Sequence, residues 1–292
     1  MTLATPTTGT SASGPVIDPV RAAYSARIRR RSTWVGVTST VVFLVVAGAL
    51  ITRAPGWPAV KHFFFDPQAA KAAFPGLIRA FWLNVRMFLV AEPCILVLAL
   101  VIAVVRQLRT PVLAPLRLVA AVYTDVVRGI PTLLLVALFG FGIPALGISW
   151  LPPEAVVWGT VALIVSYSAY VAEVFRAGIS SVHPSQRAAA RSLGLSTWQT
   201  QRYVVVPQAV RRVLPPLLND FISLQKDTAL VSFLGPLEIL RVAQIDASYT
   251  FNYTPYVVAA AIFVALTIPM ARLADWVTAR TNARQQGSVG VS

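Results

Sequence analysis

The sequence has few cysteines, histidines and acidic residues. Cys94 is the only cysteine among 292 residues and there are 2 histidines, so neither a disulfide framework nor a zinc cluster is expected. Lys61, Lys71 and Lys226 follow Val, Ala and Gln, whereas a phosphate-binding P-loop needs a glycine before its lysine. The hydrolase motifs H-E-x-x-H and G-x-S-x-G are absent as well. We therefore expect no enzymatic activity, no metal site and no cofactor in this chain.

Charge of either sign is scarce, while apolar residues are abundant. Only 12% of residues are charged and 56% are hydrophobic, whereas soluble domains are about 25% charged. The apolar residues form long uninterrupted blocks, each sufficient to cross a bilayer as a helix. The pattern predicts an all-α membrane protein with about six transmembrane helices. The predicted spans are Trp34–Ile51, Ala80–Val105, Leu116–Phe141, Glu154–Phe175, Gln208–Leu234 and Tyr253–Ala271.

The net charge of +14 does not indicate nucleic-acid binding, because the basic residues are segregated by side of the membrane. Only Arg53, Lys61, Lys71, Arg79 and Arg241 fall in one set of connections, whereas most arginines fall in the alternate set. The positive-inside rule then places both termini in the cytoplasm and predicts a multi-pass protein of the cell membrane, with lipid rather than nucleic acid around it.

The ends of the chain differ from its middle. Residues 1–33 begin with a stretch rich in Thr, Ser, Ala, Gly and Pro, and we expect a partly disordered cytoplasmic tail. Residues 34–51 are expected to form an extra N-terminal transmembrane helix; a cleaved signal peptide is the weaker alternative, because the apolar run is too long. Residues 52–76, with several prolines and aromatics, are interpreted as an external loop, and 281–292 as a cytoplasmic tail.

A polar insertion at 176–207 interrupts the membrane spans and predicts a two-helix elbow. Pro184 suits the first turn of a helix, and Gly194 is expected to end it with a positive φ. Ser196 and Gln199 have capping-box spacing for a second helix, and Pro207 opens the next membrane segment. A basic solvated loop is the simpler alternative.

This insertion resembles the signature loop of ATP-binding-cassette importer permeases, E-A-A-x-x-x-G-x9-I-x-L-P. The matching residues are Ala188, Ala189, Ala190, Gly194, Val204, Val206 and Pro207, with Ala188 in place of the family glutamate. Residues 123–133 resemble the segment Y-x-E-x-x-R-G-T-P-L-L of the polar amino-acid uptake branch, and residues 221–230 resemble its F-I-S-L-x-K-D-T-S-L. The resemblance extends over roughly residues 74–280.

The resemblance implies a type I importer permease core over residues 77–280 and ATP-driven import of a polar amino acid. It implies that the chain pairs with a second permease copy or paralogue and receives solute from an extracytoplasmic solute-binding protein. Two ATPase subunits would carry ATP and Mg²⁺. The residues that it assigns to ATPase coupling are Ala188, Ala189, Ala190, Arg191, Gly194, Leu195 and Pro207.

Charged residues within or beside the spans are candidates for the translocation path, because charges at membrane depth must be paired or face water. Asp125 and Arg128 have i, i+3 spacing near a helix that is expected to break at Pro131. They are expected to form a buried pair, with a structural or a transport role. Glu173 and Arg176 have the same spacing and are interpreted as a surface pair rather than a gate.

The remaining expectations concern the fifth span and the alternatives to an importer. Lys226 and Asp227 should face protein or water. Pro215-Pro216 should break or kink the helix, and packing against a partner helix is the alternative. An ion-coupled secondary transporter would use the same charges, but the internal repeat typical of that class is not visible. A membrane scaffold that uses the elbow to recruit a soluble partner is the second alternative.

Overall fold

The computed structural model describes residues 19–108 and 110–286, with side-chain surroundings from residue 32 to 281 except residue 109. The described part contains helices and turns and no strand. The chain divides into two compact units, residues 1–60 and 61–292. Of the predicted tails, residues 1–18 and 287–292 lie outside the described part. Residues 19–33 and 281–286 belong to helices.

The first unit consists mainly of helix α1 (Pro19–Arg53). Its apolar part, Ser32–Arg53, is 22 residues long, enough to cross a hydrocarbon core of about 30 Å at 1.5 Å per residue. Val41, Phe43 and Leu44 are each more than half exposed. A helix that is apolar all round and exposes these side chains is suited to lipid.

Helices replace the loop expected over residues 52–76. Helix α2 (Trp57–Phe64) is followed after two residues by α3 (Pro67–Gln107). Asp66 caps α3, accepting a hydrogen bond from the Gln68 backbone N–H at 2.8 Å. Pro67 occupies the first turn, where the missing N–H has no helical partner to lose. The prolines that suggested a loop are therefore compatible with a helix start.

The start of α3 is tied to a distant turn between the last two helices. The Asn252 Nδ2 atom donates to Asp66 Oδ2 and to the His62 carbonyl, both at 3.3 Å. The Tyr253 backbone N–H donates to the Phe63 carbonyl at 2.7 Å. These bonds join segments almost 190 residues apart, which local sequence patterns could not indicate.

The prediction of about six membrane spans is confirmed. Among the described residues, four helices are long and apolar enough to cross a membrane, or up to six if each of two bent helix pairs counts as one span. One bent pair combines residues 111–129 with 132–145 at 106°, and the other combines 197–234 with 239–250 at 51°.

The first bent pair breaks where the sequence predicts. A short 3₁₀ turn, η1 (Pro111–Leu113), precedes α4 (Ala114–Gly129), and α5 (Thr132–Ala145) follows. Ile130 is extended, with φ −100° and ψ 129°, because a residue before proline avoids the helical region. Pro131 thereby sets the change of direction between α4 and α5.

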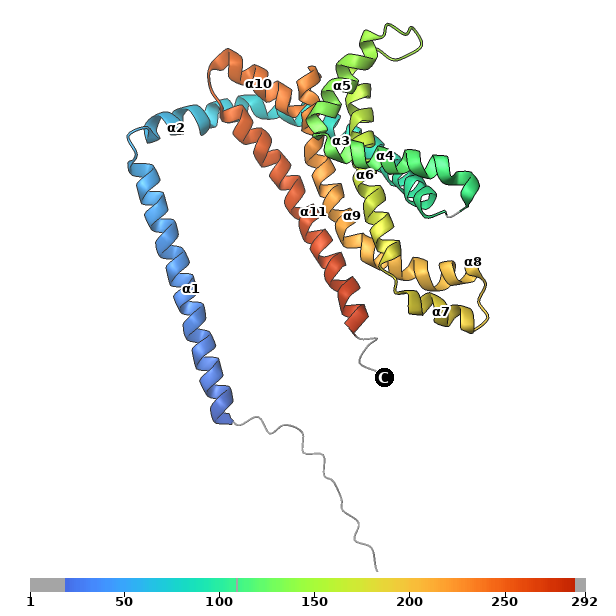
Figure 1. The fold of residues 1–292 in the computed structure, drawn as a ribbon. Helices are drawn as coiled ribbons and strands as arrows, with labels where there is room; N and C mark the ends of the chain where they lie inside the picture. Colours follow the sequence, from blue (N-terminus) through green and yellow to red (C-terminus); the bar gives the residue numbers. More distant parts are fainter. Residues whose placement is uncertain (1–18, 109, 287–292) are drawn as a thin grey trace, which may run out of the picture. The chain divides into compact units, whose positions relative to one another are not determined.

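Helix α6 (Ala155–Ser180) lies at the centre of the second unit and packs against α3, α4, α5 and α9 (Figure 1). Leu163, Tyr167 and Val171 are buried in one cluster with Ile95 of α3. Because partners surround it, α6 buries residues on several faces rather than along one stripe. This central position lets the C-terminal end of α6 connect the bundle to the elbow.

The fifth predicted span is not broken at Pro215-Pro216, so the predicted break is wrong and the alternative of a packed helix applies. Helix α9 (Val206–Asp227) continues through both prolines, continues as a 3₁₀ segment η3 (Thr228–Leu234), and turns at Gly235. Both prolines are partly buried. Packing against neighbouring helices holds the helical geometry although each proline removes one backbone donor.

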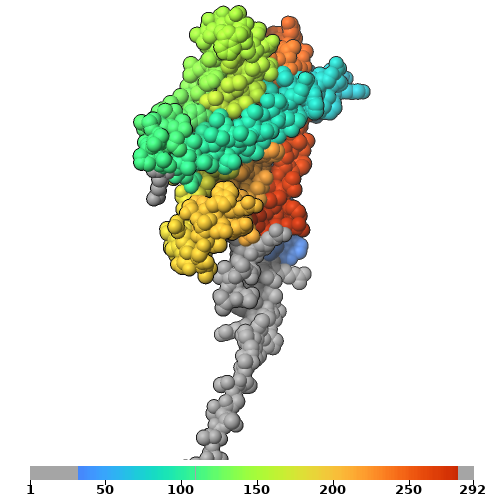
Figure 2. Space-filling view, turned by 90° about the vertical axis from the view of Figure 1, so that its right-hand side faces the viewer, coloured from blue at the N-terminus to red at the C-terminus, as the bar shows by residue number. Residues whose placement is uncertain are grey.

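The last two helices complete the bundle. Helix α10 (Ile239–Thr250) is followed by α11 (Thr254–Gln286). A second apolar cluster joins them to α3 through Leu77, Phe81, Ile239 and Ile262. Figure 1 places α10 at the end of the bundle opposite α7 (Pro184–Ser192) and α8 (Thr197–Thr200). In Figure 2 the residues around α7 and α8, in gold, protrude from the lower part of the molecule.

Candidate functional site

The first arm of the elbow, α7, has defined ends. The His183 side chain accepts a hydrogen bond from the Ser185 backbone N–H at 3.2 Å, and Pro184 is the first helical residue. At the other end Gly194 has φ +84°, which confirms the predicted positive φ. Its N–H donates to the Arg191 carbonyl, and the Leu195 N–H donates to the Ala190 carbonyl. These two bonds form a complete Schellman motif.

The second arm begins immediately after this turn. Ser196 and Gln199 form the predicted capping box: the Ser196 N–H donates to Gln199 Oε1 at 2.8 Å, and the Gln199 N–H donates to Ser196 Oγ at 3.2 Å. The Arg191 guanidinium donates to Thr197 Oγ1 across the turn. Helix α8 continues through a π-helical turn, η2 (Gln201–Val205), into α9, with Pro207 in its first turn. The angle between the arms is thus fixed by bonds on both sides of Gly194.

The elbow exposes apolar side chains that the sequence patterns did not indicate. Leu193 is 83% exposed and Trp198 is 70% exposed. Ala188 and Ala189 of α7 are exposed as well, whereas Ala190 is buried. Large apolar side chains so exposed on a polar insertion are typical of a protein interaction site. Neither Leu193 nor Trp198 belongs to the family pattern. In the sequence, only their position close to Gly194 could have indicated that they are exposed.

Hydrogen bonds anchor the elbow to the ends of two membrane helices. Arg187 Nη2 donates to the Ile179 carbonyl at 2.7 Å, and Gln208 Nε2 donates to Gln186 Oε1 at 2.9 Å. Arg212 of α9 donates to the Ser181 carbonyl just beyond α6. A force on α7 is therefore transmitted to both α6 and α9.

Close packing joins α6 to α9 just above the elbow. A Cβ atom at Gly178 would lie 2.1 Å from Val213 Cγ1, far inside van der Waals contact. Both residues are buried. Glycine is required at position 178 because the two helices approach so closely.

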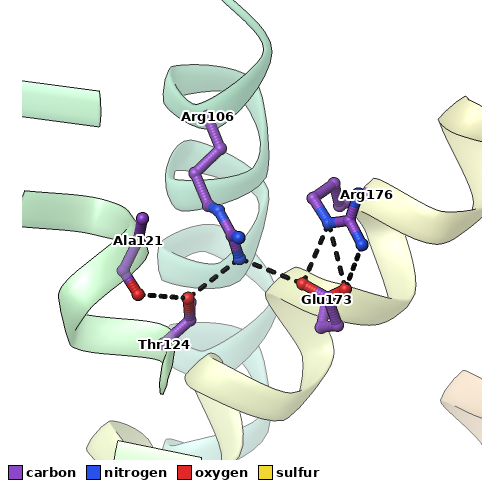
Figure 3. Close-up of polar contacts among 5 residues, drawn as sticks. All are labelled: Arg106, Ala121, Thr124, Glu173 and Arg176. Atoms are coloured by element: carbon purple, nitrogen blue, oxygen red, sulfur yellow. Dashed lines mark hydrogen bonds and ion pairs between the residues drawn. The ribbon is translucent and has the colours of Figure 1, made fainter. Parts of the chain in front are cut away.

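Glu173 forms a charge cluster near the same end of α6 (Figure 3). Its Oε2 atom accepts from Arg106 Nη1 of α3 at 3.0 Å, and both carboxylate oxygens accept from Arg176 Nε at 3.0 Å. Arg106 Nη1 also donates to Thr124 Oγ1 of α4 at 2.8 Å. The predicted Glu173–Arg176 pair is present. The Arg106 contact was missed, because the two residues are 67 positions apart.

The buried pair expected between Asp125 and Arg128 is not formed. Both side chains are exposed, and the ion pairs within the described part of the chain all involve Glu173. The Arg128 guanidinium lies 5.7 Å from the centre of the Tyr170 ring, and the Tyr170 hydroxyl donates to the Arg128 carbonyl. The aromatic face on α6 attracts the cation in place of the neighbouring carboxylate.

Lys226 and Asp227 are adjacent in the sequence but have different surroundings. Asp227 is half-buried and accepts a hydrogen bond from the Tyr167 hydroxyl of α6 at 2.8 Å, so it faces protein as expected. Lys226 is exposed. The structure thus gathers Glu173 with two arginines, and places Asp125, Arg128, Lys226 and Asp227 in separate surroundings.

A helical membrane bundle that anchors an exposed elbow is suited to engage another protein at that elbow. Residues 95–283 match the family model of the binding-protein-dependent transport system inner membrane component. The chain belongs to this family. It is accordingly a multi-pass inner-membrane protein and a permease subunit, whose relatives leave ATP hydrolysis to a separate subunit.

Similar proteins agree with this assignment. The probable amino-acid ABC transporter permease protein YckA of Bacillus subtilis (strain 168) is 34% identical over 70% of this chain and 88% of its own length. The nopaline transport system permease protein NocQ of Agrobacterium fabrum is 40% identical over 52% of this chain and 69% of its own. A crystal structure of an amino acid ABC transporter with histidines is 35% identical, with a TM-score of 0.67 over 74% of this chain and 98% of its own.

Proposed function

We propose that this chain is the membrane-spanning subunit of an ATP-driven importer of polar amino acids. A solute-binding protein outside the membrane delivers the amino acid. The permease works with a second copy or a paralogue, and two ATPase subunits carry ATP and Mg²⁺ while this chain holds no cofactor. The similar permeases that are named as amino-acid or glutamine transporters and the two branch motifs support this substrate class.

The observation that carries the proposal is the rigid, exposed elbow. Its two arms are capped on both sides of Gly194, and it presents Leu193 and Trp198 to solvent. Burying a large apolar side chain is favourable by about 1.5–3 kcal/mol, and part of this gain is offset by the entropic cost of association. A solubilising loop needs neither a fixed angle nor an apolar surface. We infer that the elbow seats in a groove of the ATPase.

The coupling mechanism follows from the anchors of the elbow. Closure of the ATPases displaces the elbow, and Arg187 and Arg212 transmit that displacement to the ends of α6 and α9. Close packing at Gly178 keeps these two helices together as they move. The bundle then rocks between states open to either side, as rigid-body transitions do. Both termini and the elbow lie on the cytoplasmic side in this proposal.

Three charged side chains are exposed on the single permease chain and need polar surroundings in the membrane. Asp125, Arg128 and Lys226 reach the surface of the single chain, yet charges are expensive in lipid. We infer that they face the second permease or the water-filled path between the two permeases. Glu173 and Asp227 instead hold neighbouring helices together through Arg106 and Tyr167.

Reconstitution in proteoliposomes tests the proposed function. The permease, its ATPase and its binding protein should take up labelled amino acid only when ATP is present on the ATPase side. Omission of the ATPase should abolish uptake. Uptake that follows an imposed ion gradient without ATP would support a secondary transporter, and absence of uptake under every condition would support a scaffold.

A further inference from the structure

A cavity of about 410 Å³ lies between α5, η3, α10 and α11. Helix α10 is at the end of the bundle opposite the elbow (Figure 1). Leu133, Phe233 and Leu240 supply apolar walls, and Arg241, Gln244 and Tyr256 supply polar groups. Small-molecule sites have volumes of about 300–1,000 Å³ and combine apolar walls with a few polar groups. The cavity therefore has the size and lining of a site for a small amphipathic molecule.

Arg241 contributes the charge of this cavity and lacks an acidic partner. Its Nη1 atom donates to Gln244 Oε1 at 2.8 Å, whereas its Nε atom is buried and has no hydrogen-bond acceptor among the described residues. No carboxylate in the described part forms an ion pair with it. A half-buried guanidinium with an unused donor is costly, because it has lost water without gaining an acceptor.

The nearest carboxylate in the sequence is already engaged. Glu238 is fully buried and caps α10, accepting from the backbone N–H groups of Leu240 and Arg241. It also accepts from Asn84 Nδ2 at 3.0 Å. These bonds direct the Glu238 carboxylate toward the helix start and α3. The buried Nε atom of Arg241 cannot reach a ligand itself, but the terminal Nη1 and Nη2 groups of the guanidinium remain available for an acceptor that enters the cavity.

We propose that Arg241 binds the α-carboxylate of the transported amino acid in this cavity. The inference rests on the proposed function and names a recognition group for it. The planar guanidinium pairs with a carboxylate through parallel N–H donors, which lysine does not match. The ammonium group then lies near the oxygens of Gln244 and Tyr256, and the apolar walls accept the side chain of the substrate.

Direct binding to the permease–ATPase complex in nanodiscs, without binding protein, tests this inference. The probes are L-histidine, L-arginine and L-glutamine, each compared by calorimetry with its decarboxylated amine. The wild-type complex should bind at least one amino acid and discriminate against the matching amine. Arg241→Gln should weaken amino-acid binding about 10- to 100-fold, the loss expected for hydrogen bonds to a charged group, and leave amine binding unchanged.

Two further variants separate recognition from general effects of charge or folding. Arg241→Lys keeps the charge without the paired donors and should give an intermediate loss. Lys71→Gln removes a positive charge from an exposed position on α3 that does not line the cavity, and should bind as the wild type does. Size-exclusion profiles of all variants monitor folding.

Several outcomes overturn the inference. Wild-type failure to bind any probe, equal binding of amines, or unchanged amino-acid binding by Arg241→Gln each contradicts it. If Arg241→Gln weakens stimulation by the binding protein while direct binding is unchanged, the guanidinium contacts that protein instead. ATP-driven uptake by the wild-type and Arg241→Gln importers, measured in parallel, distinguishes failure of this inference from failure of the proposed function. Equal uptake by the two refutes only the role of Arg241. Absence of uptake by the wild type refutes the proposed function.

Discussion

Glu173 is the shared acceptor of two arginines on different helices, and its loss therefore has more consequences than the loss of either partner. Arg106 brings α3 to the carboxylate and also reaches Thr124 of α4, whereas Arg176 lies one turn away on the same helix. Exposure of the three charged side chains ranges from 17% to 39%, between the buried and the surface cases. The contribution of these ion pairs to stability is therefore expected to lie between those of surface and of buried ion pairs.

Replacement of Glu173 is expected to destabilise the permease more than replacement of Arg176. Glu173→Gln leaves two guanidinium groups without a carboxylate and should cost about 1–3 kcal/mol, whereas Arg176→Gln preserves the Arg106 contact and should cost below about 1 kcal/mol. Thermal unfolding of the detergent-solubilised protein provides the measurement. Arg272→Gln, at an exposed position, is the control. Equal melting temperatures for Glu173→Gln and the control would show that the Glu173 charge cluster does not stabilise the protein.

Asp125 and Arg128 should behave independently, because the structure separates their side chains. Asp125→Asn and Arg128→Gln should lower uptake by amounts whose free energies add in the double variant within about 0.5 kcal/mol. A double-mutant cycle on the uptake rate measures this. A coupling free energy of more than about 1 kcal/mol would contradict this and would indicate that the two residues form the ion pair predicted from the sequence.

At the scale of elements, the contact between α6 and α9 connects the elbow to the membrane bundle. Gly178→Ala places a Cβ against Val213 and should destabilise the protein by about 1–3 kcal/mol. Adding Val213→Ala removes the opposing methyl groups and should recover part of that loss. Gly142→Ala, in α5, meets no atom within 4 Å and serves as control. If the double variant lost the sum of the stability losses of Gly178→Ala and Val213→Ala, the two residues would not be in contact.

Local signals predicted the elements that depend on neighbouring residues in the sequence. Apolar runs gave the spans, Pro131 gave the break between α4 and α5, and Gly194 with Ser196 gave the turn of the elbow. Each depends on backbone geometry within a few residues. Helix α2 and the uninterrupted α9 were missed, since proline has different effects at a helix start, in a loop and in a packed helix.

Contacts between distant segments could not be predicted in this way. The Arg106–Glu173 bond and the bonds from Asn252 to the start of α3 require the assembled bundle. The exposed positions of Leu193 and Trp198 are also a property of the folded elbow. Conversely, Asp125 and Arg128 had suitable spacing for a pair, but Tyr170 of a neighbouring helix provides a competing partner.

At the scale of the whole molecule, the proposed orientation predicts accessibility from each side of the membrane. Cys94 is first replaced by alanine, because it is exposed. Single cysteines at Gln68 and Ser248, both exposed, should react with a membrane-impermeant maleimide in intact cells. A cysteine at Ser196 should react only after the membrane is opened. Labelling of position 196 in sealed cells would reverse the orientation of the permease.

The central claim is that the elbow couples ATP hydrolysis to transport through the geometry set by Gly194. A Cβ at this residue would meet no atom within 4 Å, so the strain on a substituted residue comes from the positive φ rather than from a Cβ clash. Valine strains that conformation by about 1–2 kcal/mol, whereas asparagine tolerates it. The decisive measurement is ATP-driven amino-acid uptake, with membrane abundance, for the wild type and the Val and Asn variants. Gly194→Val should insert normally but lose uptake, and Gly194→Asn should retain most of it. Wild-type uptake by Gly194→Val would contradict the account.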